Sequence, residues 1–538
     1  MELNLGPLKF SRTRVLLWLV AVAWFTGLCW WHRNVAIDDA WITFRYARNF
    51  VEGHGFVFNA GEPLEGYSNF LWMLFSSVAI SANVEPLGAV RVLGWLSVVA
   101  GFGLLIHGIP RAATITLAAP RVVLETSDSP SAGAPAELPP YSSATAALIL
   151  AAAYPLAVWT MMGLETAFYA MLLLALLVQL NELWRAPSIL KSLLVGALLV
   201  ALAMTRPEGA MWMALLFGVF LSTDRRRVSL TFALPLALFT SAFAVYTAWR
   251  FHTFGTIIPN TVAAKVGGGA GASVANGAVY LFGALGQGFL ISFLLTLVVV
   301  VRHLRHRGGG GLPHGNMVLI CACALALQVA FTIGVGGDWM PSARFLVPAL
   351  APLCILASLA IRPWPLFVRI VILAFFFLSG FLHARDEAML RWCRWAGKEV
   401  GGKLLTEPQR IAGDFLRVNA KPTDVLAATE AGVVPYHARL PFIDMLGLVD
   451  AHIASMPGGL HQKFDTSYVL ARKPDLILLG FDVTAAGLVP KWTPDQELFA
   501  SDDFQKSYAE VERWPRPMNN AKWGMQEGCM VLYRRKQQ

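Results

Sequence analysis

Two adjacent carboxylates, Asp38 and Asp39, follow a long apolar segment of the chain after only a few residues. The same short stretch, NVAIDDAWITFRYARN (34–49), also contains Arg45 and Arg48. A well-placed carboxylate takes a proton from an attacking hydroxyl, and an arginine holds a phosphate through charge-assisted hydrogen bonds. This combination predicts a site that binds an anionic substrate and activates a nucleophile.

Charged side chains of the same kinds recur between the later apolar segments. An unpaired charge at membrane depth costs at least ~2.5–3.5 kcal/mol, so charges beside apolar segments pair with one another or line a cavity. We therefore expect these residues to converge on one site. The candidate residues are Asp38 and Asp39 as catalytic carboxylates, Arg45, Arg206, Lys265 and Arg344 as phosphate ligands, and His54, Glu65, Glu165, Glu208, Asp338 and Trp339 as substrate contacts.

Simpler structural roles remain open for several of these residues. Asp38 and Asp39 could cap the helix that follows them and stabilise its first turn. Arg45 could anchor that helix at the membrane interface, and Arg206 could hold a helix end instead of a phosphate. We expect Glu165 to orient its neighbours and not to react itself.

The composition of the whole chain indicates a membrane protein. Of its 538 residues, 56% are hydrophobic and only 14% are charged, whereas soluble proteins average about 25% charged residues. Runs without acidic or basic residues recur up to about residue 383, and each is close to the ~20 residues that cross a bilayer core. The net charge of +9 includes short basic loops between these runs, a pattern typical of cytoplasmic turns and not of a nucleic-acid surface.

We expect eleven membrane-spanning helices, which places the two ends of the chain on opposite sides. The expected spans are 14–31, 88–108, 144–160, 164–180, 189–204, 208–222, 228–250, 277–301, 316–335, 345–361 and 365–383. With the N-terminus inside, this number leaves the basic clusters 225–227 and 302–307 on the cytoplasmic side. A further apolar segment, 67–83, would reverse that order if it crossed, so we expect it to lie along the outer surface or to dip in without crossing.

The last part of the chain differs in kind from the rest. Charge returns after residue 383, and short apolar runs such as DLILLG (475–480) are typical of buried strands. We expect a transmembrane domain over 1–383, with a first outer loop at 32–87, and a C-terminal extracytoplasmic α/β domain over 384–538. About 155 residues are enough for such a domain to have its own core.

Five motifs resemble, in the same order, those of one glycosyltransferase superfamily. They are IDDAWITFRYARNFVEGHGFVFNAGEPLEGYSNFLW (37–72), MGLETAFYA (162–170), TRPEGA (205–210), GGDWMPSARFLVP (336–348) and GVVPYHARLPFIDMLGLVD (432–450). The resemblance is to the GT-C integral-membrane glycosyltransferases, and within them to the branch of the terminal arabinofuranosyltransferases. It implies a polyprenyl-phosphate sugar donor and an acidic base in the first outer loop. The first member of the family's acidic pair corresponds to Asp38, so the resemblance ranks Asp38 above Asp39.

Together, the resemblance and the charge pattern predict glycosyl transfer of an inverting or related type at the outer face of the inner (plasma) membrane. The expected donor is a polyprenyl-phosphate sugar, with an arabinofuranose-like pentose favoured, and the expected acceptor is an envelope glycan or glycoprotein. A transporter or flippase of lipid-linked sugars, or a non-catalytic scaffold of envelope assembly, remains the alternative. The only other partner expected is the lipid bilayer, and no nucleic acid. No metal site is predicted, although a divalent cation is compatible with the chemistry, and Cys393 could pair with Cys529 in an exported domain.

Overall fold

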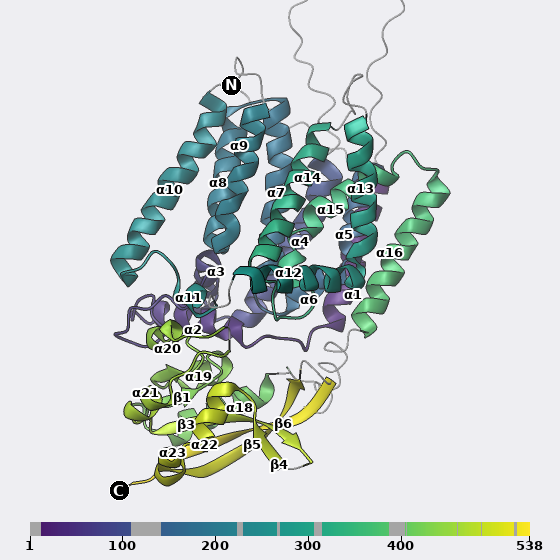
Figure 1. Cartoon of the computed structure of the whole chain (residues 1–538). Helices are drawn as coiled ribbons and strands as arrows, with labels where there is room; N and C mark the ends of the chain where they lie inside the picture. The colour runs from purple at the N-terminus through teal and green to yellow at the C-terminus, as the bar shows by residue number, and fades with distance from the viewer. Residues whose placement is uncertain are drawn as a thin grey trace, which may run out of the picture.

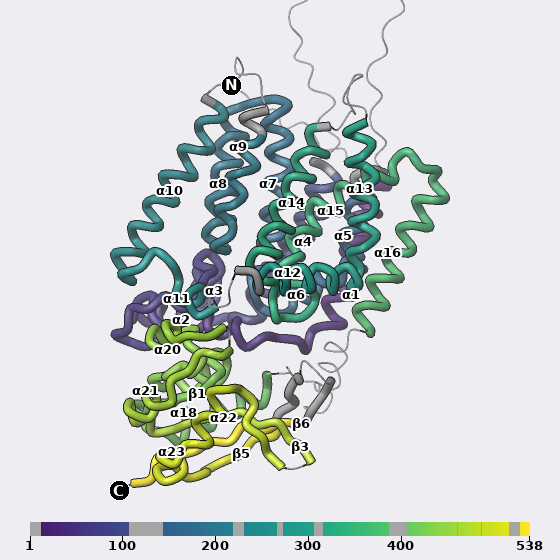
Figure 2. Tube along the Cα trace, in the orientation of Figure 1, coloured from purple at the N-terminus to yellow at the C-terminus, as the bar shows by residue number. Residues whose placement is uncertain are grey.

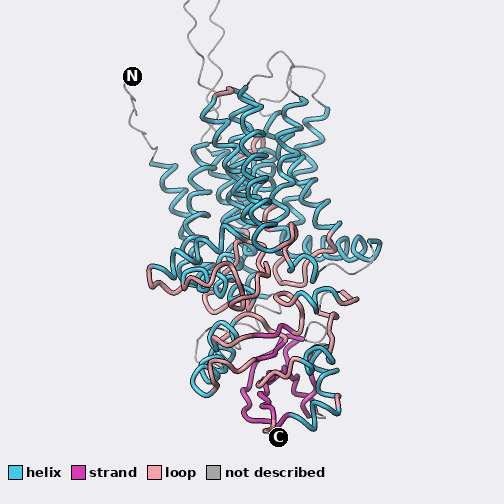
Figure 3. The backbone as a smooth tube through the Cα atoms, turned by 90° about the vertical axis from the view of Figure 1, so that its left-hand side faces the viewer, coloured by secondary structure: helices cyan, strands magenta, loops and turns pink. Residues whose placement is uncertain are grey.

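The computed structural model consists of a helical bundle with a smaller α/β domain at one end (Figure 1). All strands of the described residues lie in that smaller domain, as Figure 3 shows. The structure describes residues 12–108, 141–222, 230–265, 270–305, 315–386, 404, 406–459, 461–485, 487–520 and 524–537. The expected basic cluster at 225–227 and Cys393 lie outside these residues.

The long apolar runs form the helices of the bundle, because a helix satisfies its backbone hydrogen bonds within its own segment where water is absent. These elements are α1 (Arg12–Trp31), α2 (Asp39–Val51), α3 (Phe70–Ser81), α4 (Pro86–Gly108), α5 (Tyr141–Ala152), α6 (Tyr154–Met161), α7 (Thr166–Arg185), α8 (Ile189–Thr205), η2 (Pro207–Trp212), α9 (Met213–Ser222), α10 (Leu230–Phe254), α11 (Asn260–Lys265), α12 (Ala270–Ala284), η4 (Leu285–Phe289), α13 (Leu290–Arg305), α14 (Gly315–Gly334), η5 (Arg344–Leu346), α15 (Leu350–Ile361) and α16 (Leu366–Asp386). Within the described residues, seven helical units are long and apolar enough to cross a membrane: α1, α4, α7, α10, α12 joined to α13, α14 and α16. The chain is thus a multi-pass membrane protein, as its composition predicts.

Each of the eleven expected spans corresponds to between one and three of these elements, although the number of crossings stays a prediction. Helices α8 and α15 are apolar but shorter, with 17 and 12 residues. Helix α8 packs against α7 and α10, and α15 packs against α13 and α14. Helix α3 has 12 residues and is about 18 Å long, which is well short of the ~30 Å hydrocarbon core. This length agrees with a segment that dips in without crossing.

Two of the expected spans contain breaks that hydropathy does not predict. Helices α5 and α6 meet at an angle of 63°, and Pro155 in the first turn of α6 cannot donate a hydrogen bond to the preceding turn. The expected span 277–301 is interrupted at η4, where Gln287 and Gly288 leave helical geometry. Helix α12 therefore lies across the lower end of the bundle, whereas α13 runs along the length of the bundle (Figure 1). Hydropathy reports how apolar a segment is, not the direction in which it runs.

The C-terminal part forms a six-stranded mixed sheet with the order β2-β1-β3-β6-β5, and β4 pairs with β3. Strand β1 is parallel to β2 and β3, whereas β6 is antiparallel to β3 and β5. The strands are β1 (Leu426–Ala428), β2 (Phe442–Asp444), β3 (Leu476–Thr484), β4 (Gly487–Pro490), β5 (Tyr508–Asn520) and β6 (Gly524–Arg535), and the helices are α18 (Glu407–Asn419), α19 (Val433–Ala438), α20 (Ala451–Ser455), α21 (Thr466–Ala471), α22 (Thr493–Ala500) and α23 (Asp502–Ser507). The predicted α/β domain is confirmed.

This domain shares a hydrophobic core with the first outer loop. One buried cluster contains Ile42, Tyr46 and Phe58 from that loop together with Leu426 and Leu478 from the sheet. Figure 2 shows the purple segment of α2 lying directly against the green C-terminal segments around α20. The first outer loop therefore belongs structurally to both parts of the chain.

Candidate active site

The two carboxylates at the start of α2 face different surroundings. The side chain of Asp38 accepts hydrogen bonds from the backbone N–H groups of Gly432 and Val433, at 2.9 and 2.8 Å. These N–H groups stand at the start of α19, where helical N–H groups have no partner within the helix. Asp38 therefore holds the C-terminal domain against the first outer loop.

Asp39 instead lines a recess of about 430 Å³, a volume that includes the part open to solvent. The walls of the recess come from α2, residues 66–69, Glu165, α11 and Leu448. Burial raises the pKa of the Asp39 carboxyl above its usual value, and the positive charge of Lys265 opposes this effect. A carboxylate with a raised pKa accepts a proton more readily than an exposed one does at the same pH.

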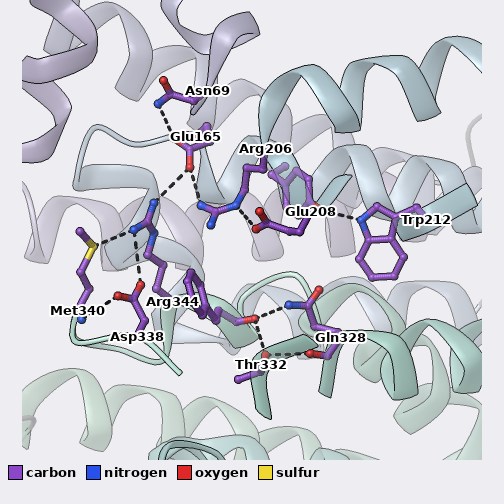
Figure 4. Close-up of polar contacts among 12 residues, drawn as sticks. Asn69, Glu165, Arg206, Glu208, Trp212, Gln328, Thr332, Asp338, Met340 and Arg344 are labelled. Carbon is purple, nitrogen blue, oxygen red and sulfur yellow. Dashed lines mark hydrogen bonds and ion pairs between the residues drawn. The ribbon is translucent and has the colours of Figure 1, made fainter. Parts of the chain in front are cut away.

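Glu165 joins Arg206 and Arg344 into one polar network (Figure 4). Its carboxylate accepts a hydrogen bond from Arg206 Nη1 at 2.6 Å, another from Arg344 Nη2 at 3.3 Å, and a third from Asn69 Nδ2 at 2.8 Å. Arg206 also pairs with Glu208. The network is buried, and each arginine is paired with a carboxylate in it. In this position Glu165 fixes the directions of the two guanidinium groups, and its role in the reaction stays a prediction.

Arg344 reaches the recess from the loop between α14 and α15. Its Nη1 lies 3.5 Å from Asp338 Oδ2 and 3.0 Å from Met340 Sδ. The two residues before it, Ser342 and Ala343, have φ of 53° and 47°, a backbone region that non-glycine residues rarely adopt. Such strain costs on the order of 1–3 kcal/mol and persists only where the surrounding structure holds it. Here the strained backbone directs the Arg344 guanidinium towards Glu165.

Lys265 is the last residue of α11 and supplies a further cation to the recess. As a whole residue it is exposed, unlike Arg206 and Arg344, but burial of its ammonium lowers the pKa below the usual value, and the negative charge of Asp39 opposes this effect. An ammonium beside a guanidinium is well suited to an anionic phosphate. Of the four predicted phosphate ligands, Lys265 and Arg344 line the recess, and Arg206 lies one ion pair behind it.

The expectation that Arg45 binds phosphate is corrected by its surroundings. Its buried guanidinium donates to the backbone carbonyl oxygens of Phe58, Pro435 and Leu440, at 2.9, 2.8 and 2.7 Å, and to the Asn59 side chain. Arg45 does not line the recess. It satisfies carbonyl groups at the junction between the first outer loop and the C-terminal domain. The sequence could not indicate this role, because Pro435 and Leu440 are 390 and 395 residues away.

Of the six predicted substrate contacts, only Glu165 lines the recess. Glu208 and Asp338 pair with Arg206 and Arg344 instead, and the other three lie elsewhere. Glu65 is buried and pairs with Arg250 at 2.8 Å, and burial raises its pKa to about 7. His54 is exposed in the turn after α2. Trp339 is half exposed, and its ring lies 5.3 Å from that of His461 in the C-terminal domain.

Sequence reasoning missed several lining residues. Asn69 precedes α3 within the motif YSNFLW, but its bond to Glu165 requires knowledge of the fold. Thr43, Thr261 and Leu448 also line the recess. Leu448 belongs to a quoted motif, yet an apolar residue in a separate domain gives no signal that it closes a site in the membrane part.

The charged residues of the recess do not form a metal site of the usual kind. Among the described residues, no three His, Cys, Asp or Glu side chains are grouped so that they could hold a metal ion. The cations Lys265, Arg206 and Arg344 occupy the positions near the carboxylates. These side chains can compensate an anionic substrate directly.

Comparison with known proteins gives one family model and several relatives. Residues 402–533 match a family described as a domain of unknown function (DUF8728). The terminal beta-(1->2)-arabinofuranosyltransferase of Mycobacterium tuberculosis (strain ATCC 25618 / H37Rv) is 26% identical over 384 residues, which cover 65% of this chain and 56% of that protein. The chain thus spans little more than half the length of this curated relative.

Two solved structures share the fold over most of their length. ArnT from Cupriavidus metallidurans, bound to undecaprenyl phosphate, superposes with a TM-score of 0.53 at 12% identity and covers 96% of this chain and 97% of its own. The Archaeoglobus fulgidus oligosaccharyltransferase in the apo form superposes with a TM-score of 0.54 at 11% identity, over 96% of this chain and 81% of its own. These matches confirm the predicted fold class, a polytopic helical membrane domain with a C-terminal α/β domain.

Proposed function

We propose that this chain, which has the GT-C fold, is a membrane glycosyltransferase that transfers a sugar from a polyprenyl-phosphate donor to an acceptor hydroxyl. The observation that carries the proposal is the recess in which the Asp39 carboxylate lies beside Lys265 and Arg344. A base and phosphate-binding cations in one recess provide both functions that the reaction requires. The recess is lined by α2 and α11 of the membrane part and by Leu448 of the C-terminal domain. These elements lie where the helical bundle meets the C-terminal domain (Figure 1), which is where a lipid-borne head group would be presented.

Asp39 is the general base in this proposal, in place of Asp38. The acceptor oxygen attacks the anomeric carbon, its proton passes to Asp39, and the bond from that carbon to the phosphate oxygen breaks. Polyprenyl phosphate leaves with the bonding electron pair, and a single displacement of this kind inverts the anomeric configuration. Asp38 is less suited to the role because it accepts two backbone hydrogen bonds at the junction with the C-terminal domain.

Lys265 and Arg344 bind the donor phosphate and stabilise the charge that grows on it as the bond breaks. Arg206, held by Glu165 and Glu208, adds positive charge from behind the recess. The solved relative bound to undecaprenyl phosphate supports a polyprenyl-phosphate donor, and the curated relative supports an arabinofuranose-like sugar. An envelope glycan or glycoprotein on the extracytoplasmic side of the inner membrane is the corresponding acceptor, with the C-terminal domain on that side.

A direct assay tests the proposal. Purified protein in detergent is incubated with a panel of radiolabelled polyprenyl-phosphate pentoses and hexoses and with envelope glycan fragments. We expect transfer from at least one donor, with loss of transfer in Asp39→Asn and retention in Lys421→Met, which changes an exposed lysine of the C-terminal domain. Transfer by folded Asp39→Asn at the normal rate would exclude this residue as the base. No turnover of any donor, together with movement of lipid-linked sugar across proteoliposomes, would favour a transporter.

A further inference from the structure

The short helix α11, which carries Lys265, is held by the C-terminal domain at both of its ends. At its start, the Asn260 side chain donates to the backbone carbonyl oxygens of Gly447 and Leu448, at 2.8 and 3.0 Å. The Asn260 backbone N–H donates to the carbonyl oxygen of Glu65 at 2.8 Å, which ties the same end to the first outer loop. The position of α11 is therefore set largely by residues from elsewhere in the chain.

Near its other end, α11 is bound by Lys463. This lysine is buried, with 5% of its surface exposed, and its Nζ donates to the carbonyl oxygens of Ala263 and Ala454, each at 2.8 Å. Ala263 lies two residues before Lys265, and Ala454 lies in α20 of the C-terminal domain. Burying an ammonium costs desolvation free energy, and its hydrogen bonds to the two carbonyl groups offset this cost. The two hydrogen bonds therefore hold α11 and α20 in one arrangement.

The loop whose carbonyl groups bind Asn260 is held by a buried carboxylate. Asp444, fully buried at the end of β2, accepts hydrogen bonds from the backbone N–H groups of Leu446 and Val449 at 2.9 and 2.8 Å. This arrangement fixes the carbonyl groups of the loop, and it also presents Leu448 to the recess. The C-terminal domain thus provides one wall of the recess and the support for one of its cations.

We propose that Lys463 and Asn260 are positioning residues that place Lys265 against the donor phosphate, so that the C-terminal domain completes the donor side of the active site. This inference rests on the proposed function. It assigns to the C-terminal domain a role in donor binding, in addition to any contact that it makes with the acceptor.

Binding of polyprenyl phosphate to the full-length protein in detergent tests this assignment. Lys463→Met keeps the apolar part of the side chain and removes both hydrogen bonds, so we expect roughly tenfold weaker binding of polyprenyl phosphate. Lys463→Arg, which retains a donor and a charge, should recover part of the loss. Lys421→Met should bind normally.

A double-mutant cycle separates positioning from a general loss of stability. If Lys463 acts through Lys265, then Lys463→Met weakens binding in the wild-type background but adds nothing in a Lys265→Ala background. If the two losses multiply instead, Lys463 acts by another route and the inference is overturned. Asn260→Ala gives the same cycle from the other end of α11 and replaces Lys463→Met should that variant not fold.

The outcomes also distinguish this inference from the proposed function. Weak binding by Lys265→Ala, with normal binding by both Lys463→Met and Asn260→Ala, overturns only the inference. Normal binding of polyprenyl phosphate by folded Lys265→Ala overturns both, because the cation would then have no part in the donor site.

Discussion

Asp38 and Asp39 are adjacent in the chain, and the direction of their side chains separates their roles. Asp38 is bound to backbone N–H groups of the C-terminal domain, whereas Asp39 lines the recess beside Lys265. Position in the sequence cannot reveal this difference, because the groups that bind Asp38 are more than 390 residues away. The two residues can be tested separately by the same substitution.

Asp39→Asn should lower transfer by about 10²-fold or more, because the amide cannot take the proton from the acceptor hydroxyl. Asp38→Asn should act on stability instead. Its side chain can keep only one of the two hydrogen bonds, and its amino group would face the other N–H, at a cost of about 1–3 kcal/mol. Rates per folded molecule and thermal unfolding in detergent measure the two effects. A large loss of rate in folded Asp38→Asn, with normal rates in Asp39→Asn, would restore Asp38 as the base.

The raised pKa of Asp39 gives the reaction a specific pH dependence. The base must be ionised to accept a proton, so kcat/KM for the acceptor should fall as the pH drops through a pKa above the usual value for an aspartate. The charge of Lys265 lowers this pKa, so Lys265→Ala should move the acid limb to higher pH, and Lys421→Ala should leave it in place. An acid limb that does not move in Lys265→Ala would show that the titrating group is not beside Lys265.

At the scale of elements, the junction between α2 and α19 depends on a glycine. A Cβ at Gly432 would lie 2.0 Å from the backbone oxygen of Asp38 and 2.5 Å from its Oδ2. Gly432→Ala should therefore displace α19 and destabilise the protein by about 1–3 kcal/mol. Gly27→Ala in α1, where a Cβ meets nothing within 4 Å, is the matched control. Equal melting temperatures for the two variants would mean that the junction adapts without cost.

Helices were easier to predict from sequence than their arrangement. Hydropathy located the apolar segments because each helix that crosses a bilayer must be apolar along its length. It did not reveal the 63° bend between α5 and α6 or the break at Gly288, since these depend on local backbone geometry. The charged residues between the apolar segments were also recognised from composition, because they interrupt the apolar runs. Composition does not reveal which of these residues face the recess. Arg45, for example, lies away from the recess because of contacts with residues distant in sequence, and no local pattern encodes such contacts.

At the scale of the whole molecule, the shared core changes the expectation for truncation. Removal of the chain after residue 395 would leave Asp38 without the two backbone N–H groups that it binds, and Arg45 without two of its three carbonyl partners. It would also expose Ile42 and Tyr46. Leaving one buried charge without its partner costs on the order of 3–5 kcal/mol. We therefore expect the truncated protein to unfold at lower temperature and to lose donor hydrolysis as well as transfer.

A protease site inserted near residue 395 provides the control for this truncation. Cleavage after folding leaves the contacts between the two parts intact, so the cleaved protein should stay associated and active. An active, stable truncated protein would show that the first outer loop folds without the shared core.

The arrangement of charged ends predicts the topology. Lys191 lies in the first turn of α8, at the opposite end of that helix from Arg206, and Arg305 is the last residue of α13. Reporter fusions at these two residues should read as cytoplasmic, and a fusion at the C-terminus should read as exported. A cytoplasmic C-terminal fusion would place the recess on the other side of the membrane and would contradict the proposed donor and acceptor.

The contact between Arg45 and Leu440 joins residues 395 positions apart, which has a consequence for synthesis of the protein. A ribosome adds about 5–20 residues per second, so roughly 20–80 s pass between the appearance of Arg45 and that of its partner. Throughout that interval the nascent first loop lacks the groups that Asp38, Arg45 and Asn59 bind, and Lys463 has not yet been added to hold α11. The recess is therefore assembled only after Lys463 has been added, and a chain that stalls or terminates before that residue cannot form it.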